Sequence, residues 1–172
     1  VSFTADDWDA ALGDYFDDCG WGDDAIARYV AAMAALPQVT PLGKVYSYNN
    51  ACFNLTGRGI EKVTGKPFEE AMAELVIEPL GLDRTFFFPW EAMVHRFATG
   101  HISPYDANEP VGVGVPWPIG RASHPAGGVI SSVKQLLKYA QFHMGDGNGV
   151  LSAESLAQMA DEQPRSLDGL GR

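Results

Sequence analysis

Residues 45–81 read VYSYNNACFNLTGRGIEKVTGKPFEEAMAELVIEPLG, and the pattern of this stretch decides how the middle of the chain folds. Apolar residues at helical spacing predict a helix from about Asn50 to Val63. Gly65 is typical of the residue that follows a helix, and Pro67 of the first turn of the next one. A second helix is therefore predicted from about Phe68 to Ile77. The residues expected to share one side of the first helix are Phe53, Gly57, Ile60 and Val63.

Further helices are predicted outside this stretch by the same signals. An Ala-rich amphipathic segment at 25–36 follows two aspartates and is stopped by Pro37. The remaining helices are expected just after Pro89, from Ser131 or Ser132 to Met144, and from Ser152 to Asp161. Residues 101–120 are rich in Pro and Gly, which predicts a long irregular loop of a kind that is often functional. Strand signals are scarce, so the chain is predicted to be mainly α and one domain over residues 1–172.

Composition sets broad limits on function. The 172 residues are 46% hydrophobic and 20% charged, which fits one globular domain. The formal charge of −10 disfavours nucleic acid as a partner, because such binding depends on neutralising phosphates. No apolar run approaches the ~20 residues that a membrane span needs. Eight aspartates precede Arg28, but they lack the ligand spacing of an EF-hand and favour a solvated acidic loop over a metal site.

Cofactor and metal motifs are not found either. The histidines show no HExxH or paired helical spacing, so zinc is not expected. The glycines of 112–120 lack the strand–GxGxxG–helix context of a dinucleotide site. Cys19 and Cys52 are compatible with a disulfide or with two thiols, and Cys52 fits a small buried hydrophobe. The chain begins with Val1 and shows no signal peptide, as a piece of a longer protein would, so its localisation is left open.

Polar side chains gather where the first of these helices begins. Tyr48, Asn49 and Asn50 are costly to bury unless each finds a hydrogen-bond partner. One interpretation is a packed tyrosine followed by Asn50 as a helix cap. The other is the wall of a catalytic site. Similar alternatives hold for aromatic residues further along, which suit either a substrate cleft or core and loop anchors: Phe86, Phe87, Phe88, Trp90 and Trp117.

Two blocks of sequence decide between these interpretations. Residues 41–87 contain Tyr48-Asn49-Asn50 and then EPLG, and residues 124–147 begin HPAGG and continue into a helical pattern. Together they resemble the serine β-lactamase-like family, which includes class C β-lactamases, D-alanyl-D-alanine peptidases and esterases. The resemblance extends from about Gly13 to Met159. The order and spacing of the three motifs are specific, although a Tyr-x-Asn triplet alone is weak.

The resemblance implies both a fold and a site. The fold is the helical subdomain of the β-lactamase/transpeptidase-like α/β fold, without most of the sheet. Tyr48 would take part in proton transfer, and Asn50 would hold a catalytic lysine and a substrate amide. The enzyme would form an acyl-enzyme with a small acyl substrate, either a β-lactam, a D-Ala peptide or an ester. The remaining segments of the parent hydrolase would be its partners, and no cofactor is implied.

The sequence departs from the family pattern at two catalytic elements. No S-x-x-K lies upstream of Tyr48, and the one at 131–134 follows the AGG turn, where a helix start explains it. No K-T-G follows Met144, and Thr64-Gly65-Lys66 is a turn at a helix end. We therefore expect the isolated chain not to turn over acyl substrates. The alternative is a non-catalytic helical module derived from the family, which has no need to expose the Tyr48 hydroxyl in a cleft.

Overall fold

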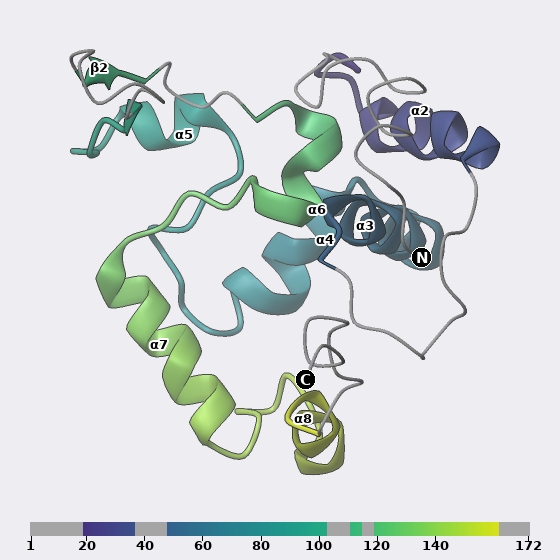
Figure 1. Cartoon of the computed structure of the whole chain (residues 1–172). Helices are drawn as coiled ribbons and strands as arrows, with labels where there is room; N and C mark the ends of the chain where they lie inside the picture. The colour runs from purple at the N-terminus through teal and green to yellow at the C-terminus, as the bar shows by residue number, and fades with distance from the viewer. Residues whose placement is uncertain (1–18, 37–47, 103–110, 115–118, 162–172) are drawn as a thin grey trace, which may run out of the picture.

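The computed structural model describes residues 19–36, 48–102, 111–114 and 119–161, and in these parts the chain is mostly helical (Figure 1). This confirms the predicted class. The elements in chain order are α2 (Ala25–Ala32), η1 (Met33–Ala35), α3 (Asn50–Thr64), α4 (Phe68–Met72), η2 (Ala73–Ile77), α5 (Pro89–Met93), β1 (His101–Ile102), β2 (Gly112–Val113), η3 (Arg121–Ser123), α6 (His124–Gly127), α7 (Val133–Met144) and α8 (Ala153–Met159).

The ends of α3 follow from local chemistry. Asn49 precedes it with an extended backbone, and its side chain accepts a hydrogen bond from the backbone N–H of Cys52 at 3.2 Å. Gly65 ends the helix at φ 70°, a left-handed conformation in which a side chain would be strained. The chain then continues directly into α4, as the order of Gly65 and Pro67 predicts.

The helix α3 lies at the centre of the described fold. It packs against α2, α4 and α6, and Figure 1 shows it nearly end-on among them. One buried cluster lies around Tyr29 of α2 and includes Ala51 at the start of α3. A second cluster joins Ile26, Phe68 and Phe87, with the two phenylalanine rings 5.4 Å apart and nearly perpendicular.

The buried face of α3 differs from the predicted one. Gly57 is buried and Ile60 packs against the second cluster, but Phe53 and Val63 are 57% and 88% exposed. The helix buries a face of small and polar residues instead: Ala51, Asn54, Gly57 and Glu61. Small residues allow the neighbouring backbone to approach closely, and apolar spacing alone does not reveal such a contact.

The helices α5, α7 and α8 lie where the sequence predicts helices, whereas η3 and α6 were not predicted. β1 and β2 pair antiparallel, with His101 opposite Val113, inside the stretch predicted to be irregular. Ser152 caps α8 by accepting a hydrogen bond from the backbone N–H of Ser155 at 3.1 Å. Within the parts of the chain described above, no helix is both long and apolar enough to cross a bilayer.

Candidate active site

Tyr48 and Asn50 lie on either side of the residue that caps α3. Tyr48 precedes the helix and is 74% exposed, so the ring is not sealed in apolar packing. Asn50 is the first helical residue and is partly buried. The alternative role given to Asn50, that of helix cap, is wrong, because Asn49 has the extended backbone of a cap and makes the bond. Capping therefore does not use the Asn50 amide.

A close contact between backbone and ring fixes α3 against α6. A β-carbon placed on Gly57 would lie 2.2 Å from Cγ of Pro125, so only glycine fits there. Asn54, which is fully buried, donates from its amide nitrogen to the Ser123 hydroxyl at a long 3.5 Å. The segment that carries Tyr48 is thus the start of a helix whose position is set by residues about 70 positions further along the chain.

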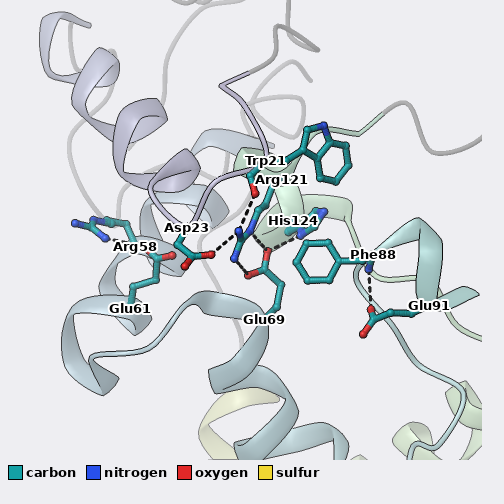
Figure 2. A network of polar contacts seen from close by, with 9 residues as sticks. All are labelled: Trp21, Asp23, Arg58, Glu61, Glu69, Phe88, Glu91, Arg121 and His124. Atoms are coloured by element: carbon teal, nitrogen blue, oxygen red, sulfur yellow. Dashed lines mark hydrogen bonds and ion pairs between the residues drawn. The ribbon is translucent and has the colours of Figure 1, made fainter.

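A buried charged cluster is formed by Glu69, Arg121 and His124 (Figure 2). Arg121 donates to both carboxylate oxygens of Glu69, from Nε at 3.2 Å and from Nη2 at 3.1 Å. His124 Nδ1 lies 2.6 Å from Oε1 of the same carboxylate. Because an ionised carboxylate only accepts, Nδ1 of His124 must carry the proton in this bond. All three side chains are at least nine-tenths buried.

Arg121 also fastens the segment before α2. Its Nη1 donates to the backbone oxygen of Trp21 at 2.8 Å and to Oδ1 of Asp23 at 2.7 Å. Its guanidinium lies 5.3 Å from the centre of the Phe88 ring, within range of a cation–π contact. One arginine therefore joins three segments that are far apart in the sequence.

The electrostatics of the cluster follow from these bonds. Burial by itself raises the pKa of Glu69, but the hydrogen bonds from His124, Arg121 and its own backbone, with the charge of Arg121, lower it from 4.5 to about 2. Burial likewise opposes the charge on Arg121, yet the hydrogen bonds that it donates to Glu69 and Asp23, with the charges of these carboxylates, raise its pKa overall. The carboxylate and the guanidinium are thus both charged at neutral pH.

The aromatic residues singled out in the sequence divide between several roles. Phe87 is a core residue at 5% exposure. Phe88 stacks on Trp90 with ring centres 4.6 Å apart, and its ring is nearly perpendicular to that of His124. Phe86 and Phe87 also contribute to the lining of a cavity between residues 84–100 and 119–133. Trp117 lies outside the described residues.

The two look-alike motifs lie at helix ends. Ser132 occupies the position before α7, although its side chain makes no capping bond, and the Ser131 hydroxyl lies 2.8 Å from that of Thr85. Thr64-Gly65-Lys66 forms the turn after α3, as predicted. In the described parts of the chain, no three His, Cys, Asp or Glu side chains gather where they could hold a metal ion.

The charged cluster is not predicted from the sequence. Glu69 has the position of an ordinary acidic residue in a first helical turn, and His124 was considered only as a zinc ligand. One weak signal was present: Arg121 and His124 lie three residues apart beside the HPAGG turn, inside a stretch with few other charges. Nothing in the sequence links this pair to Glu69, more than 50 residues earlier.

Known proteins are similar to this chain in fold and in sequence. Penicillin-binding protein 4 of Amycolatopsis lactamdurans is 33% identical over 162 residues, which cover 91% of this chain and 42% of the relative. The octameric penicillin-binding protein homologue from Pyrococcus abyssi superposes with a TM-score of 0.70 at 27% identity, over 89% of this chain and 33% of its own. The D-amino acid amidase from Ochrobactrum anthropi SV3, in complex with L-phenylalanine amide, superposes with a TM-score of 0.63 at 25% identity. The match covers 87% of this chain and 42% of the amidase chain.

The family follows from a match that covers nearly the whole of the chain. The chain spans less than half the length of each of the three proteins. A family model for beta-lactamase matches residues 3–171, which is nearly the whole of the chain. The match includes the Tyr48 segment, the charged cluster and the HPAGG turn. The chain therefore belongs to the beta-lactamase family.

Proposed function

We propose that this chain supplies the Tyr-x-Asn element of a serine hydrolase that acts through an acyl-enzyme. Tyr48 takes part in proton transfer, and the Asn50 amide holds a lysine and the substrate. The substrates are small acyl compounds: β-lactams, D-Ala peptides, esters or, as the relatives named for D-amino acid amidase suggest, amides of D-amino acids. The serine, its lysine and the third motif come from other segments of the parent protein.

One observation carries this proposal, namely the exposure of Tyr48 at the start of a rigidly held helix. A phenol in water titrates near ~10, so a tyrosine base needs a neighbouring cation and access to the reacting atoms. The 74% exposure of Tyr48 leaves room for both. The contacts of Gly57 and Asn54 fix the helix behind it, and an aligned catalytic group needs such support.

The isolated chain is expected to be inactive. Covalent catalysis needs a nucleophile, and without it only residual effects of binding and charge stabilisation remain. The test uses a chromogenic cephalosporin and p-nitrophenyl acetate with the 172-residue chain. We expect hydrolysis no faster than in buffer with an equal amount of an unrelated protein. Turnover that disappears in Tyr48→Phe would show that the chain carries its own nucleophile and would overturn this part of the proposal.

A chimera tests the role of Tyr48 itself. The matching segment of penicillin-binding protein 4 from A. lactamdurans is replaced by this chain, and β-lactam acylation is followed. In an active chimera, Tyr48→Phe is expected to lower the acylation rate constant by about 10²–10⁴, with the initial binding of the β-lactam little changed, because it removes a proton-transfer group. Tyr139→Phe, on α7 and 39% exposed, is the matched control and should keep full activity.

The same chimera separates the alternative function. A non-catalytic helical module predicts that Tyr48→Phe acylates at the same rate as the unmodified chimera. That result, with both variants folded by circular dichroism, would favour a scaffold role and would remove Tyr48 from the catalytic machinery.

A further inference from the structure

A cavity of about 770 Å³ lies between residues 84–100 and residues 119–133. Backbone bonds hold its two walls together, because Phe86 and Ile130 exchange two N–H···O bonds of 2.8 Å each. The hydroxyls of Thr85 and Ser131 meet at 2.8 Å beside this pair. The cavity is thus built into the fold, and its size is that of sites for small organic ligands.

The charge of the lining is the opposite of that of the chain. The full sequence has 22 acidic and 12 basic residues, yet the described lining residues include Arg84 and Arg96 and no aspartate or glutamate. His124 also lies at the cavity, and the carboxylate behind it, Glu69, is already paired with Arg121. Asp83 and Glu91 are neighbours of lining residues in the sequence, but neither lines the cavity, and Glu91 accepts a hydrogen bond from the backbone N–H of Phe88. Among the described lining residues, the two arginines are thus the side chains with a permanent charge.

A histidine orients one of these arginines. Arg84 Nη1 lies 3.0 Å from Nδ1 of His95, and since a guanidinium only donates, Nδ1 must be the acceptor. The neutral His95 ring then carries its proton on Nε2. The ring stacks on Phe86, with centres 5.3 Å apart and planes 17° apart, so Phe86 and His95 together steady Arg84 at the wall.

Apart from the hydroxyls of Thr99, Ser131 and Ser132, the remaining walls are mostly apolar. They are suited to a hydrocarbon or aromatic group and would bind a bare inorganic anion poorly, because such an ion keeps its hydration. A ligand that combines an apolar body with one carboxylate satisfies both parts of the lining. The larger apolar side chains that contribute include Phe86, Phe87, Phe97, Ile119, Val129 and Ile130.

We propose that this cavity binds small monocarboxylates with an aromatic or branched apolar body, whose carboxylate is held by Arg84 and Arg96. Guanidinium groups bind carboxylates through paired, charge-assisted hydrogen bonds. The apolar body lies against the phenylalanines of the same segment and against Ile119, Val129 and Ile130 of the opposite wall. This site is independent of the role proposed for Tyr48, and it requires no nucleophile.

The experiment titrates ¹⁵N-labelled full chain with 4-phenylbutyrate, up to about 10 mM because a ligand of this size binds weakly. We expect saturable shifts confined to residues 84–100 and 119–133. The neutral comparator 4-phenylbutanamide has the same body, and we expect it to bind about tenfold more weakly, as the loss of a charge-assisted hydrogen bond implies.

Charge variants assign the carboxylate to its partners. Arg84→Gln and Arg96→Gln should each weaken 4-phenylbutyrate binding about threefold to tenfold and leave the amide unaffected. Arg28→Gln, a loss of the same charge on α2 and outside the lining, should change neither affinity. The proposal is overturned by shifts that do not saturate, by shifts outside the two segments, by equal binding of acid and amide, or by unchanged affinity in both arginine variants.

Discussion

Replacing Glu69 by glutamine should remove the charge that holds Arg121 and His124 in the fold. The glutamine has nearly the same shape, so the change tests electrostatics more than packing. In the unmodified chain, Glu69 is 7% exposed and both of its oxygens accept hydrogen bonds from charged or ring N–H groups. In Glu69→Gln the guanidinium of Arg121 is left in a buried position with Asp23 as its remaining carboxylate.

The size of the effect follows from the pKa of Glu69. A pKa lowered from 4.5 to about 2 corresponds to about 3 kcal/mol of stabilisation by the charged form at neutral pH. The folded pKa lies below the ordinary value, so this stabilisation is complete above about pH 5 and is lost as the pH falls from 4.5 towards 2. Breaking a buried ion pair by removing one partner costs about 3–5 kcal/mol, which agrees.

The assay is urea denaturation followed by circular dichroism, repeated at intervals from pH 7 to pH 3. We expect Glu69→Gln to lose about 3 kcal/mol of unfolding free energy at pH 7. The difference in unfolding free energy between the variant and the unmodified chain should narrow below pH 4.5. Glu70→Gln, the exposed neighbour, is the control and should change the free energy by less than about 0.5 kcal/mol. A loss below about 1 kcal/mol at pH 7, or a gap that does not change with pH, would refute the electrostatic account of the cluster.

Two further predictions concern α3. Gly57→Ala should destabilise the fold by about 1–3 kcal/mol because its β-carbon would overlap Pro125, whereas Gly59→Ala, with nothing within 4 Å, should stabilise it by about 0.5–1 kcal/mol. The midpoints of urea denaturation are compared for the two variants. Equal changes in stability would show that Gly57 and Pro125 are not in close contact. Asn49→Ala should cost about 1 kcal/mol through loss of the cap, and Asn50→Ala less than about 0.5 kcal/mol, measured the same way. A larger loss of stability in Asn50→Ala than in Asn49→Ala would show that Asn50 caps the helix.

The helices could be predicted because their signals are local. Gly65 needs only its own left-handed backbone to end α3, and Ser152 needs only the N–H three residues on to begin α8. The interpretation of Asn50 as the cap was wrong by one residue, because Asn49 caps the helix. Neighbouring asparagines carry the same chemistry, and only the backbone angles of the folded chain separate them.

The tertiary contacts could not be predicted from the same signals. Apolar spacing favoured Phe53 and Val63 for the buried side of α3, but the contact that fixes the helix is made by a glycine and a distant proline. The charged cluster joins Glu69 to Arg121, which lie 52 residues apart in the sequence. The spacing of residues in a single sequence predicts local helices, but it does not predict which distant side chains will pair. The roles of Tyr48 and Asn50 rest on their spacing within the family motifs, and they stay predictions until the chimera is assayed.

The arrangement around Arg121 also bears on how the chain is made. Its partners Trp21, Asp23 and Glu69 are all synthesised earlier than Arg121 itself. On a ribosome, α2, α3 and α4 emerge first, and the guanidinium that fastens them arrives only after residue 121 has left the exit tunnel. Until then the Glu69 carboxylate faces water without its counter-charge. The nascent helices are therefore exposed to chaperones and proteases until this arginine emerges, and a chain cut short before it would remain so.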